Sequence, residues 1–326
     1  MNILIIGCGS IGKRHIRNLR SIGYTEIFAV DPTPSRREEA EQDGAKSTFA
    51  ELEQALAHVD MDAGFVCNPT SMHIATCTTL AKAGIPVFVE KPLDKDLSGA
   101  DELLAIIKEK GLASMIGYCL RFGESAIRFK QLLDDGAIGR PLFAAGDYSS
   151  YLPEWHPWED YREFYMAKKD LGGGALLDDS HILDLAHMML GDFAKVYAEV
   201  GTLSDLEIDS DDCFDLILTT TQGVRVNLHG DLFSKSGREK FMVVGTQGTL
   251  TWEVGEDKVI LEVPETGQTT IFQASEHYNE KYIHEAKLFL DAIKQGTVLD
   301  QLDMEHAVTI QRILVAAHEN AGKASV

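Results

Sequence analysis

Basic residues are scarce in this sequence, and long apolar runs are missing from it. The 326 residues include 30 Lys and Arg against 51 Asp and Glu, which gives a formal net charge of −21. Nucleic acids and anionic membrane surfaces bind to basic surfaces, so this balance argues against both kinds of partner. Every apolar run is shorter than the roughly 20 residues needed to span a bilayer. A small anionic ligand is not excluded, because a local group of basic side chains is enough to bind one.

Cysteine is also rare, and its spacing forms no motif. The five cysteines lie far apart, without a C-x-x-C pair, at Cys8, Cys67, Cys77, Cys119 and Cys213. An odd number of scattered cysteines, most of them in apolar runs, predicts reduced and buried thiols. No second cluster of His and Cys at ligand spacing appears, so we expect no metal. The sequence opens with a short apolar strand rather than a secretory signal, and we expect a cytoplasmic protein.

The first 120 residues alternate between apolar runs and helix-like segments. Runs that are apolar throughout are typical of strands buried on both faces, and their alternation with helices predicts βαβ units. The predicted strands are 2–6, 26–30, 63–67, 86–89 and 113–119, and the predicted helices are 11–22, 36–43, 51–58, 72–83 and 98–110. We therefore expect residues 1–120 to form a Rossmann domain with a doubly wound parallel sheet.

Residues 121–326 have a different pattern and are expected to form a second α/β domain. Long strands in series, with turns such as 221–223 and 246–248, predict a large and mostly antiparallel open sheet. The predicted strands are 142–150, 196–201, 212–220, 224–231, 240–245, 249–254, 258–263 and 269–272, and the predicted helices are 124–135, 278–295 and 304–322, with an irregular segment at 151–171.

A dinucleotide-binding motif follows the first predicted strand. The segment from Gly7 to Gly12 reads G-x-G-x-x-G, between a buried strand and a helix. Gly7 permits the tight turn, Gly9 lets the backbone approach a pyrophosphate, and Gly12 allows the helix to pack closely on the strand. The free N–H groups of the helix start, at Ser10 and Ile11, attract the anion.

Two further strand ends are expected to contact the cofactor. Asp31 ends the second predicted strand, where a carboxylate binds the ribose hydroxyls of NAD and repels a 2′-phosphate. The neighbouring Arg36 and Arg37 would favour NADP in part, and NAD is the preferred prediction. Asn68 and Thr70 follow the strand at 63–67 and are expected to line the cofactor. His73 begins the next helix, either as a cofactor contact or as a residue that bonds locally.

Glu90-Lys91-Pro92, at another strand end, makes the pattern specific. Together with the glycine motif, the Pro69-Thr70-x-x-His73 stretch and the segment 83–92, it resembles the glucose–fructose oxidoreductase / inositol dehydrogenase (Gfo/Idh/MocA) family. The resemblance continues through Arg121-Phe122, 136–139, Gly172-Gly173-Gly174 and Tyr282-x-x-Glu285-x-x-x-Phe289, so it covers nearly the whole chain. It implies a Rossmann domain followed by an open-sheet domain that often forms dimers and tetramers, and the 151–162 stretch resembles a subgroup that accompanies amino-sugar and nonulosonic-acid pathways.

The resemblance also implies which residues act. Lys91 would bond the reacting hydroxyl, His181 would be the general base, and Asp178 would support it. The common family pattern has a Gly between this Asp and His and spaces them one residue further apart, whereas here Ser180 precedes His181, so Asp179 is an alternative to Asp178. Glu90, Lys91 and Arg121 would also contact the cofactor, while Tyr118, Trp155, Trp158 and Arg162 would join Lys91, Asp178 and His181 in binding substrate.

Together with the resemblance, these residues predict an NAD-dependent oxidoreductase that acts on a secondary hydroxyl of a sugar, amino sugar, inositol or sugar nucleotide. One alternative is an enzyme that retains NAD and uses transient oxidation for elimination, epimerisation or glycoside cleavage. Another is a non-catalytic NAD-binding sensor. A metal site formed by Asp178, Asp179, His181 and Asp184 is disfavoured, because His187 lies off the helix face of His181.

Overall fold

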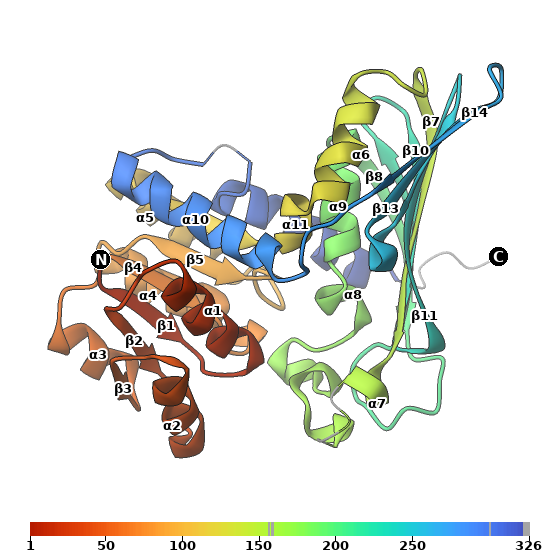
Figure 1. Ribbon diagram of the computed structural model, residues 1–326. Coiled ribbons are helices and arrows are strands. Elements are labelled where there is room, and N and C mark those ends of the chain that lie inside the picture. The colour runs from red at the N-terminus through yellow and green to blue at the C-terminus, as the bar shows by residue number, and fades with distance from the viewer. Residues whose placement is uncertain (156, 158–159, 300, 322–326) are drawn as a thin grey trace. The chain divides into compact units, whose positions relative to one another are not determined.

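The computed structural model describes residues 1–155, 157, 160–299 and 301–321. Its contacts divide the chain into two compact units (Figure 1). The first unit contains Met1–Cys119 and Asn279–Gln311, and the second contains Leu120–Tyr278 and Arg312–Val326. The sequence division at 120 and 121 assigned residues 279–311 to the second domain, whereas here they cluster with the first.

The first unit is built on a six-stranded parallel sheet. Its strands are β1 (Ile3–Ile6), β2 (Ile27–Val30), β3 (Ser47–Phe49), β4 (Ala63–Val66), β5 (Val87–Glu90) and β6 (Ser114–Gly117), in the order β3-β2-β1-β4-β5-β6. The order reverses direction at β1, as in a doubly wound Rossmann sheet, and confirms the predicted fold class. β3 is a strand that the apolar pattern does not predict, because Ser47 and Thr48 are polar and its three residues are only half-buried.

Helices surround this sheet (Figure 1). They are α1 (Ser10–Ser21), α2 (Pro34–Asp43), α3 (Leu52–His58), α4 (His73–Lys82), α5 (Ala100–Lys110) and α10 (Glu280–Gln295), with a short 3-10 turn η1 at Thr70–Met72. The ring of Phe289 on α10 packs edge-on against Phe65 of β4, at 5.5 Å between ring centroids. Burial of such apolar surface explains why a segment so late in the sequence belongs to this unit.

The second unit is built on an eight-stranded sheet. Its strands are β7 (Pro141–Tyr151), β8 (Phe193–Gly201), β9 (Cys213–Thr220), β10 (Arg225–Asp231), β11 (Phe233–Gly245), β12 (Thr249–Glu253), β13 (Lys258–Val263) and β14 (Gln268–Gln273), in the order β14-β13-β12-β11-β7-β10-β9-β8. Among the described residues of this sheet, β7 and β10 alone pair in parallel, so the predicted mostly antiparallel sheet is confirmed. β11 begins earlier than predicted, because residues 234–239 are polar or glycine and carry no apolar signal, and 235–238 are exposed.

One face of this sheet is covered by helices. Figure 1 shows α6 (Glu124–Asp134), α8 (Ala175–Asp178) and α9 (His181–Leu190) on the same side of it. Side chains of β10 alternate accordingly, with Val226 and Leu228 buried and Arg225 and Asn227 exposed. Short helical turns occupy the segment predicted to be irregular, at α7 (Leu152–Trp155), η3 (Tyr161–Glu163), η4 (Tyr165–Ala167) and η5 (Lys169–Leu171). The remaining elements are η2 (Cys119–Phe122), η6 (Val254–Glu256) and α11 (Met304–Asn320). The helix α11 begins in the first unit and ends in the second.

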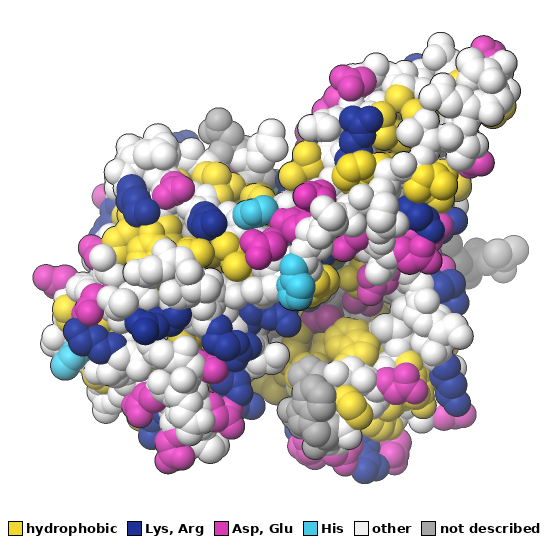
Figure 2. Space-filling model, in the orientation of Figure 1, with side chains coloured by type: hydrophobic (Ala, Val, Ile, Leu, Met, Phe, Trp, Pro, Cys, Tyr) yellow, Lys and Arg dark blue, Asp and Glu magenta, His cyan; other side chains and the backbone are white. Residues whose placement is uncertain are grey.

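Charges of both signs are mixed on the surface. Figure 2 shows basic side chains lying among acidic ones over the region of α1 and α2, where Lys13 pairs with Glu39 and Arg17 pairs with Asp43. Throughout the described part of the chain, every helix is too short or too polar to cross a membrane.

Candidate functional site

The glycine loop at the end of β1 has the geometry that a dinucleotide requires. Gly7 has a φ of +95°, and a Cβ there would lie 2.5 Å from the carbonyl oxygen of Cys67. A Cβ on Gly12 would lie 1.9 Å from the carbonyl oxygen of Gly7, so only glycine lets α1 approach the strand this closely. A Cβ on Gly9 would meet nothing within 4 Å, which leaves open space in front of the loop. Since α1 begins at Ser10, its first N–H groups border that space.

Asp31 directly follows β2 and fastens the glycine loop. Its Oδ2 accepts a hydrogen bond of 2.9 Å from the backbone N–H of Cys8, and its Oδ1 accepts one of 2.8 Å from the N–H of Thr33. The side chain of Arg36 is about half exposed, with Nη1 4.0 Å from Oδ2 of Asp31, while Arg37 donates to the carbonyl oxygen of Asp31 at 2.7 Å. The carboxylate predicted to bind ribose therefore also organises the loop beside it.

His73 connects the ends of β4 and β5. The histidine is 1 % exposed, its Nε2 lies 2.8 Å from the carbonyl oxygen of Asn68, and its Nδ1 lies 2.9 Å from the carbonyl oxygen of Pro92. Burial lowers the pKa of His73, although the two carbonyl groups oppose this change. Of the two predicted roles for His73, the structure shows local bonding. Asn68 also donates from Nδ2 to Thr76, and Thr70 is buried at the start of η1.

Lys91 follows Glu90, the last residue of β5, and its bond to Pro92 is cis. The side chain of Glu90 points into the interior of the first unit, where its Oε1 lies 2.6 Å from Nε2 of the fully buried His15. A carboxylate only accepts hydrogen bonds, so His15 donates here. The contact of Glu90 with the cofactor stays a prediction, whereas its contact with the buried side chain of His15 is seen in the structure.

The triglycine segment of the second unit turns into two short helices. Gly174 has a φ of +120° and precedes α8, which ends at Asp178, while α9 begins at His181. Asp178 is 7 % exposed, and its Oδ1 accepts a short hydrogen bond from the hydroxyl group of Tyr165. Asp179 is 2 % exposed, whereas His181 is half-buried. Asp178 and His181 thus lie at the two ends of the link between α8 and α9, and their joint role stays a prediction.

Arg121 makes a buried ion pair in the second unit. Its Nε and Nη2 each donate a 2.6 Å hydrogen bond to the carboxylate of Asp184, and the side chains are 8 % and 1 % exposed. This bidentate geometry is the strong form of an Arg–carboxylate contact. The prediction that Arg121 contacts the cofactor is untested, and its guanidinium group bonds to Asp184 in this structure.

The residues predicted to bind substrate differ in exposure: Tyr118 is buried, whereas Arg162 and Trp155 are partly exposed. Tyr118 is 1 % exposed and meets the ring of His306 edge-on, so it offers no surface to a ligand here. Arg162 is about half exposed and already bonds to Asp160 and Glu207. Trp155 is half-buried at the end of α7, and Trp158 lies outside the described residues.

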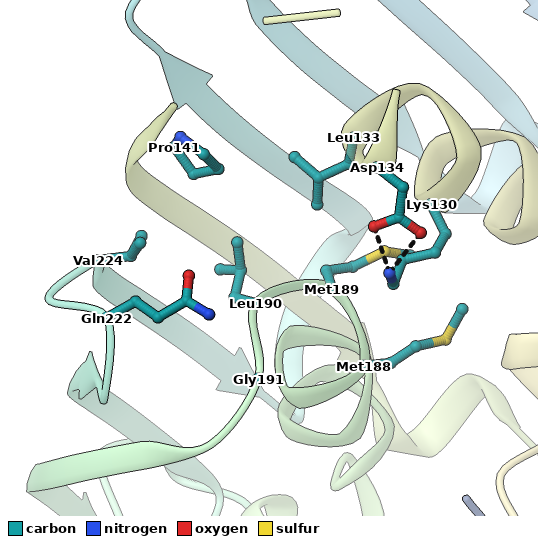
Figure 3. Close-up of a pocket in the computed structure, with 10 residues that line it drawn as sticks. All are labelled: Lys130, Leu133, Asp134, Pro141, Met188, Met189, Leu190, Gly191, Gln222 and Val224. Carbon is teal, nitrogen blue, oxygen red and sulfur yellow. Dashed lines mark hydrogen bonds and ion pairs between the residues drawn. The ribbon is translucent and has the colours of Figure 1, made fainter. Parts of the chain in front are cut away.

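Candidate metal ligands also occur away from the triglycine segment. Among the described residues, the groups of His, Cys and carboxylate side chains close enough to share an ion are Cys213, Asp215 and His229, and His15, Glu90 and Glu285. A cavity of about 420 Å³ lies in the second unit, where Lys130 pairs with Asp134 near Met188 and Met189 (Figure 3). Its lining residues, Lys130, Leu133, Asp134, Pro141, Met188, Met189, Leu190, Gly191, Gln222 and Val224, include no predicted site residue.

Sequence reasoning missed His15 and Glu285 as partners around Glu90. His15 lies on the buried side of α1 with Gly12, Ile16 and Leu19, and Glu285 lies among buried residues of α10. A titratable residue within an apolar helical stripe is a signal that could have found both.

Comparisons with known proteins agree with the fold. Residues 1–118 match the model of an oxidoreductase family with an NAD-binding Rossmann fold, and residues 127–251 match the GFO/IDH/MocA C-terminal domain. The myo-inositol 2-dehydrogenase of Thermotoga maritima is 27% identical over 309 residues, which cover 91% of this chain and 89% of the relative. The inositol 2-dehydrogenase of Rhizobium meliloti is 25% identical, over 90% of this chain and 88% of the relative.

A solved structure of levoglucosan dehydrogenase in complex with NADH and levoglucosan has the same fold. Its TM-score is 0.89 at 20% identity, with 100% of this chain and 98% of the other chain covered. The two family models together span most of the chain, in the order of its two sheets. The chain therefore belongs to the Gfo/Idh/MocA family and is an NAD(P)-dependent oxidoreductase.

Proposed function

We propose that this enzyme oxidises a secondary hydroxyl group of a sugar, amino sugar, inositol or sugar nucleotide, with NAD as the acceptor. The proposal rests on the residues that follow three neighbouring strands of the first unit, β1, β4 and β5. The glycine loop follows β1, Asn68 comes two residues after the end of β4, and Lys91 directly follows β5; these three strands are neighbours in the sheet. Ligands of doubly wound sheets bind at the carboxyl ends of strands, beside the point where the strand order reverses.

The bound dinucleotide would accept two electrons and one hydrogen from the carbinol carbon. In the proposed reaction, the ammonium group of Lys91 donates a hydrogen bond to the reacting hydroxyl and stabilises negative charge that develops on its oxygen. A ring nitrogen of His181 takes the hydroxyl proton, because the ordinary pKa of histidine lies near neutral pH. Asp178, held by Tyr165, orients the imidazole or a neighbouring substrate hydroxyl.

We propose NAD rather than NADP because of the surroundings of Asp31. Its carboxylate is 3 % exposed and fixed by two backbone N–H groups, so it keeps its place when a ligand approaches. A 2′-phosphate at this position would meet that negative charge at close range. Arg36 acts in the opposite direction, and its substitution by Ala should increase the preference for NAD.

The test is a screen for NADH absorbance with myo-inositol, levoglucosan, common sugars and UDP-sugars, with NAD and NADP in parallel. Lys91→Ala and His181→Ala should each lower kcat by about 100-fold or more, the usual contribution of a positioned acid or base, without weakening NAD binding. His187→Ala is the matched control, because His187 lies on the same helix and pairs with Asp192. Near-normal turnover by both Lys91→Ala and His181→Ala would refute the proposal. Product formed without NADH release would instead favour transient oxidation by retained NAD.

We also propose a cytoplasmic homodimer or homotetramer that associates through the open face of the second unit's sheet. Apolar side chains on this sheet are exposed, among them Tyr197 at 63% and Ile217 at 49%. Exposed apolar groups of this kind favour association. Light scattering of the purified protein tests the oligomeric state, and Tyr197→Lys should shift it toward the monomer.

A further inference from the structure

We propose that Glu285 and His15 are positioning residues, which hold the Glu90 side chain from two sides and thereby fix the turn that carries Lys91. The inference rests on the proposed function of Lys91 and adds two residues that lie outside the reacting groups. It is carried by a buried cluster within the first unit.

The cluster joins three elements that are far apart in the sequence. His15 comes from α1, Glu90 from the end of β5 and Glu285 from α10. One ligand-type atom of each lies within 4.8 Å of the others, and the closest contact is the 2.6 Å between His15 Nε2 and Glu90 Oε1. His15 and Glu285 are 0% exposed and Glu90 is 7% exposed.

Aromatic side chains surround the cluster. The ring of His15 lies 5.3 Å from that of Phe65 and 5.2 Å from that of Phe88. Space for the Glu90 side chain depends on Gly117, its ladder partner on β6, because a Cβ there would lie 2.9 Å from Phe88 and 3.4 Å from Cδ of Glu90. Polar groups in such an apolar setting must satisfy one another.

As a neutral acid, Glu285 could donate a hydrogen bond to another polar group of this buried cluster. Both of its carboxyl oxygens are buried without a hydrogen-bond partner in this structure. Burial raises the pKa of Glu285 well above its ordinary value, and the nearby Glu90 raises it further, while Arg14 opposes both effects. A protonated carboxyl group has an O–H donor, and the oxygens of Glu90 are acceptors within its neighbourhood. With that proton, Glu285 would add a hydrogen bond to Glu90 beside the one that His15 already makes.

The cluster acts on Lys91 through the backbone. Glu90 immediately precedes Lys91, and Pro92, whose carbonyl oxygen lies 2.9 Å from His73, immediately follows it. Lys91 is therefore flanked by two residues anchored to buried histidines, His15 and His73. Loss of one anchor leaves the turn free to shift, and misplacement of a catalytic group by about 1 Å can cost about 100-fold in rate.

The experiment compares Glu285→Leu, which keeps the volume but loses hydrogen bonding, with Glu285→Gln, which keeps an N–H donor. Leu290→Ala is the matched control, because Leu290 is fully buried on the same helix and has no polar group. Hydrogen exchange of the peptide 87–95 reports on the turn without any substrate. The polyol that turns over in the screen gives kcat, and NADH fluorescence gives cofactor affinity.

We expect Glu285→Leu to speed exchange of 87–95 by about tenfold or more through easier local opening. It should lower kcat by about 100-fold while NADH affinity changes little. Glu285→Gln should restore both, and Leu290→Ala should lower thermal stability without these effects. Three results would overturn the proposal: equal behaviour of Glu285→Leu and Leu290→Ala, failure of Glu285→Gln to restore the turn, or stoichiometric Zn²⁺ or Mn²⁺ in the purified protein. Hydrogen exchange tests the turn without any turnover. The kcat of Lys91→Ala tests the proposed function, so a failure of the function is distinguished from a failure of this inference.

Discussion

Removal of Arg121 should destabilise the second unit more than an ordinary polar substitution does. Both contacting nitrogens of its guanidinium group lie 2.6 Å from oxygens of Asp184, and the two side chains are 8 % and 1 % exposed. Arg121→Met would leave a buried carboxylate without its counter-ion, which typically costs about 3–5 kcal/mol. For a domain of 150–250 residues, at about 2–4 °C per kcal/mol, this corresponds to a loss of about 6–20 °C in melting temperature.

Tryptophan fluorescence provides a selective assay. All three tryptophans, Trp155, Trp158 and Trp252, belong to the second unit, so urea and thermal unfolding followed by fluorescence report on that unit. The double variant Arg121→Met/Asp184→Leu removes both charges and should recover most of the lost stability, since an apolar pair of similar volume often replaces a buried ion pair without loss. A cost of less than about 1 kcal/mol for Arg121→Met, the range of exposed ion pairs, would refute the reasoning. So would a double variant that is less stable than either single variant.

Three further predictions concern the glycine loop, the thiols and the open sheet. Gly12→Ala places a Cβ 1.9 Å from the carbonyl oxygen of Gly7, and we expect about 1–3 kcal/mol of strain, measured as weaker NADH binding by calorimetry; unchanged affinity would contradict this. Burial raises the pKa of Cys8 to about 12, and all five cysteines are buried, so Ellman's reagent should detect no thiol in the native protein and five in denaturant. Burial lowers the pKa of His229, but hydrogen bonds and charge from Asp215 and a neighbouring aspartate outweigh burial, so the net pKa is raised. Protonated His229 therefore stabilises the folded protein fully below the ordinary histidine pKa of 6.5, and this stabilisation is lost as the pH rises through the raised pKa. His229→Gln should therefore lower the melting temperature at about pH 6 and change it little at about pH 9, and an equal loss at both would exclude this role.

The sequence by itself determined the two sheets and the dinucleotide loop. Apolar runs mark β1, β2, β4, β5 and β6, because strands buried on both faces must be apolar throughout. The glycine loop is also predictable from the sequence. Gly7 has a φ of +95°, and a Cβ on Gly12 would lie 1.9 Å from the carbonyl oxygen of Gly7, so both positions require glycine. Constraints of this kind act between residues close together in the sequence, so a short window is enough to reveal them.

Tertiary structure alone decided the partners of the buried polar groups. Arg121 follows a strand end, and the order of residues does not indicate its partner, yet its guanidinium group bonds to Asp184. Glu90 meets His15, and Glu285 on α10 joins them from nearly the other end of the chain. A buried charge takes the nearest group that can satisfy it, and which group is nearest depends on how distant segments pack. The order of residues therefore locates Lys91, whereas packing decides what holds it in place.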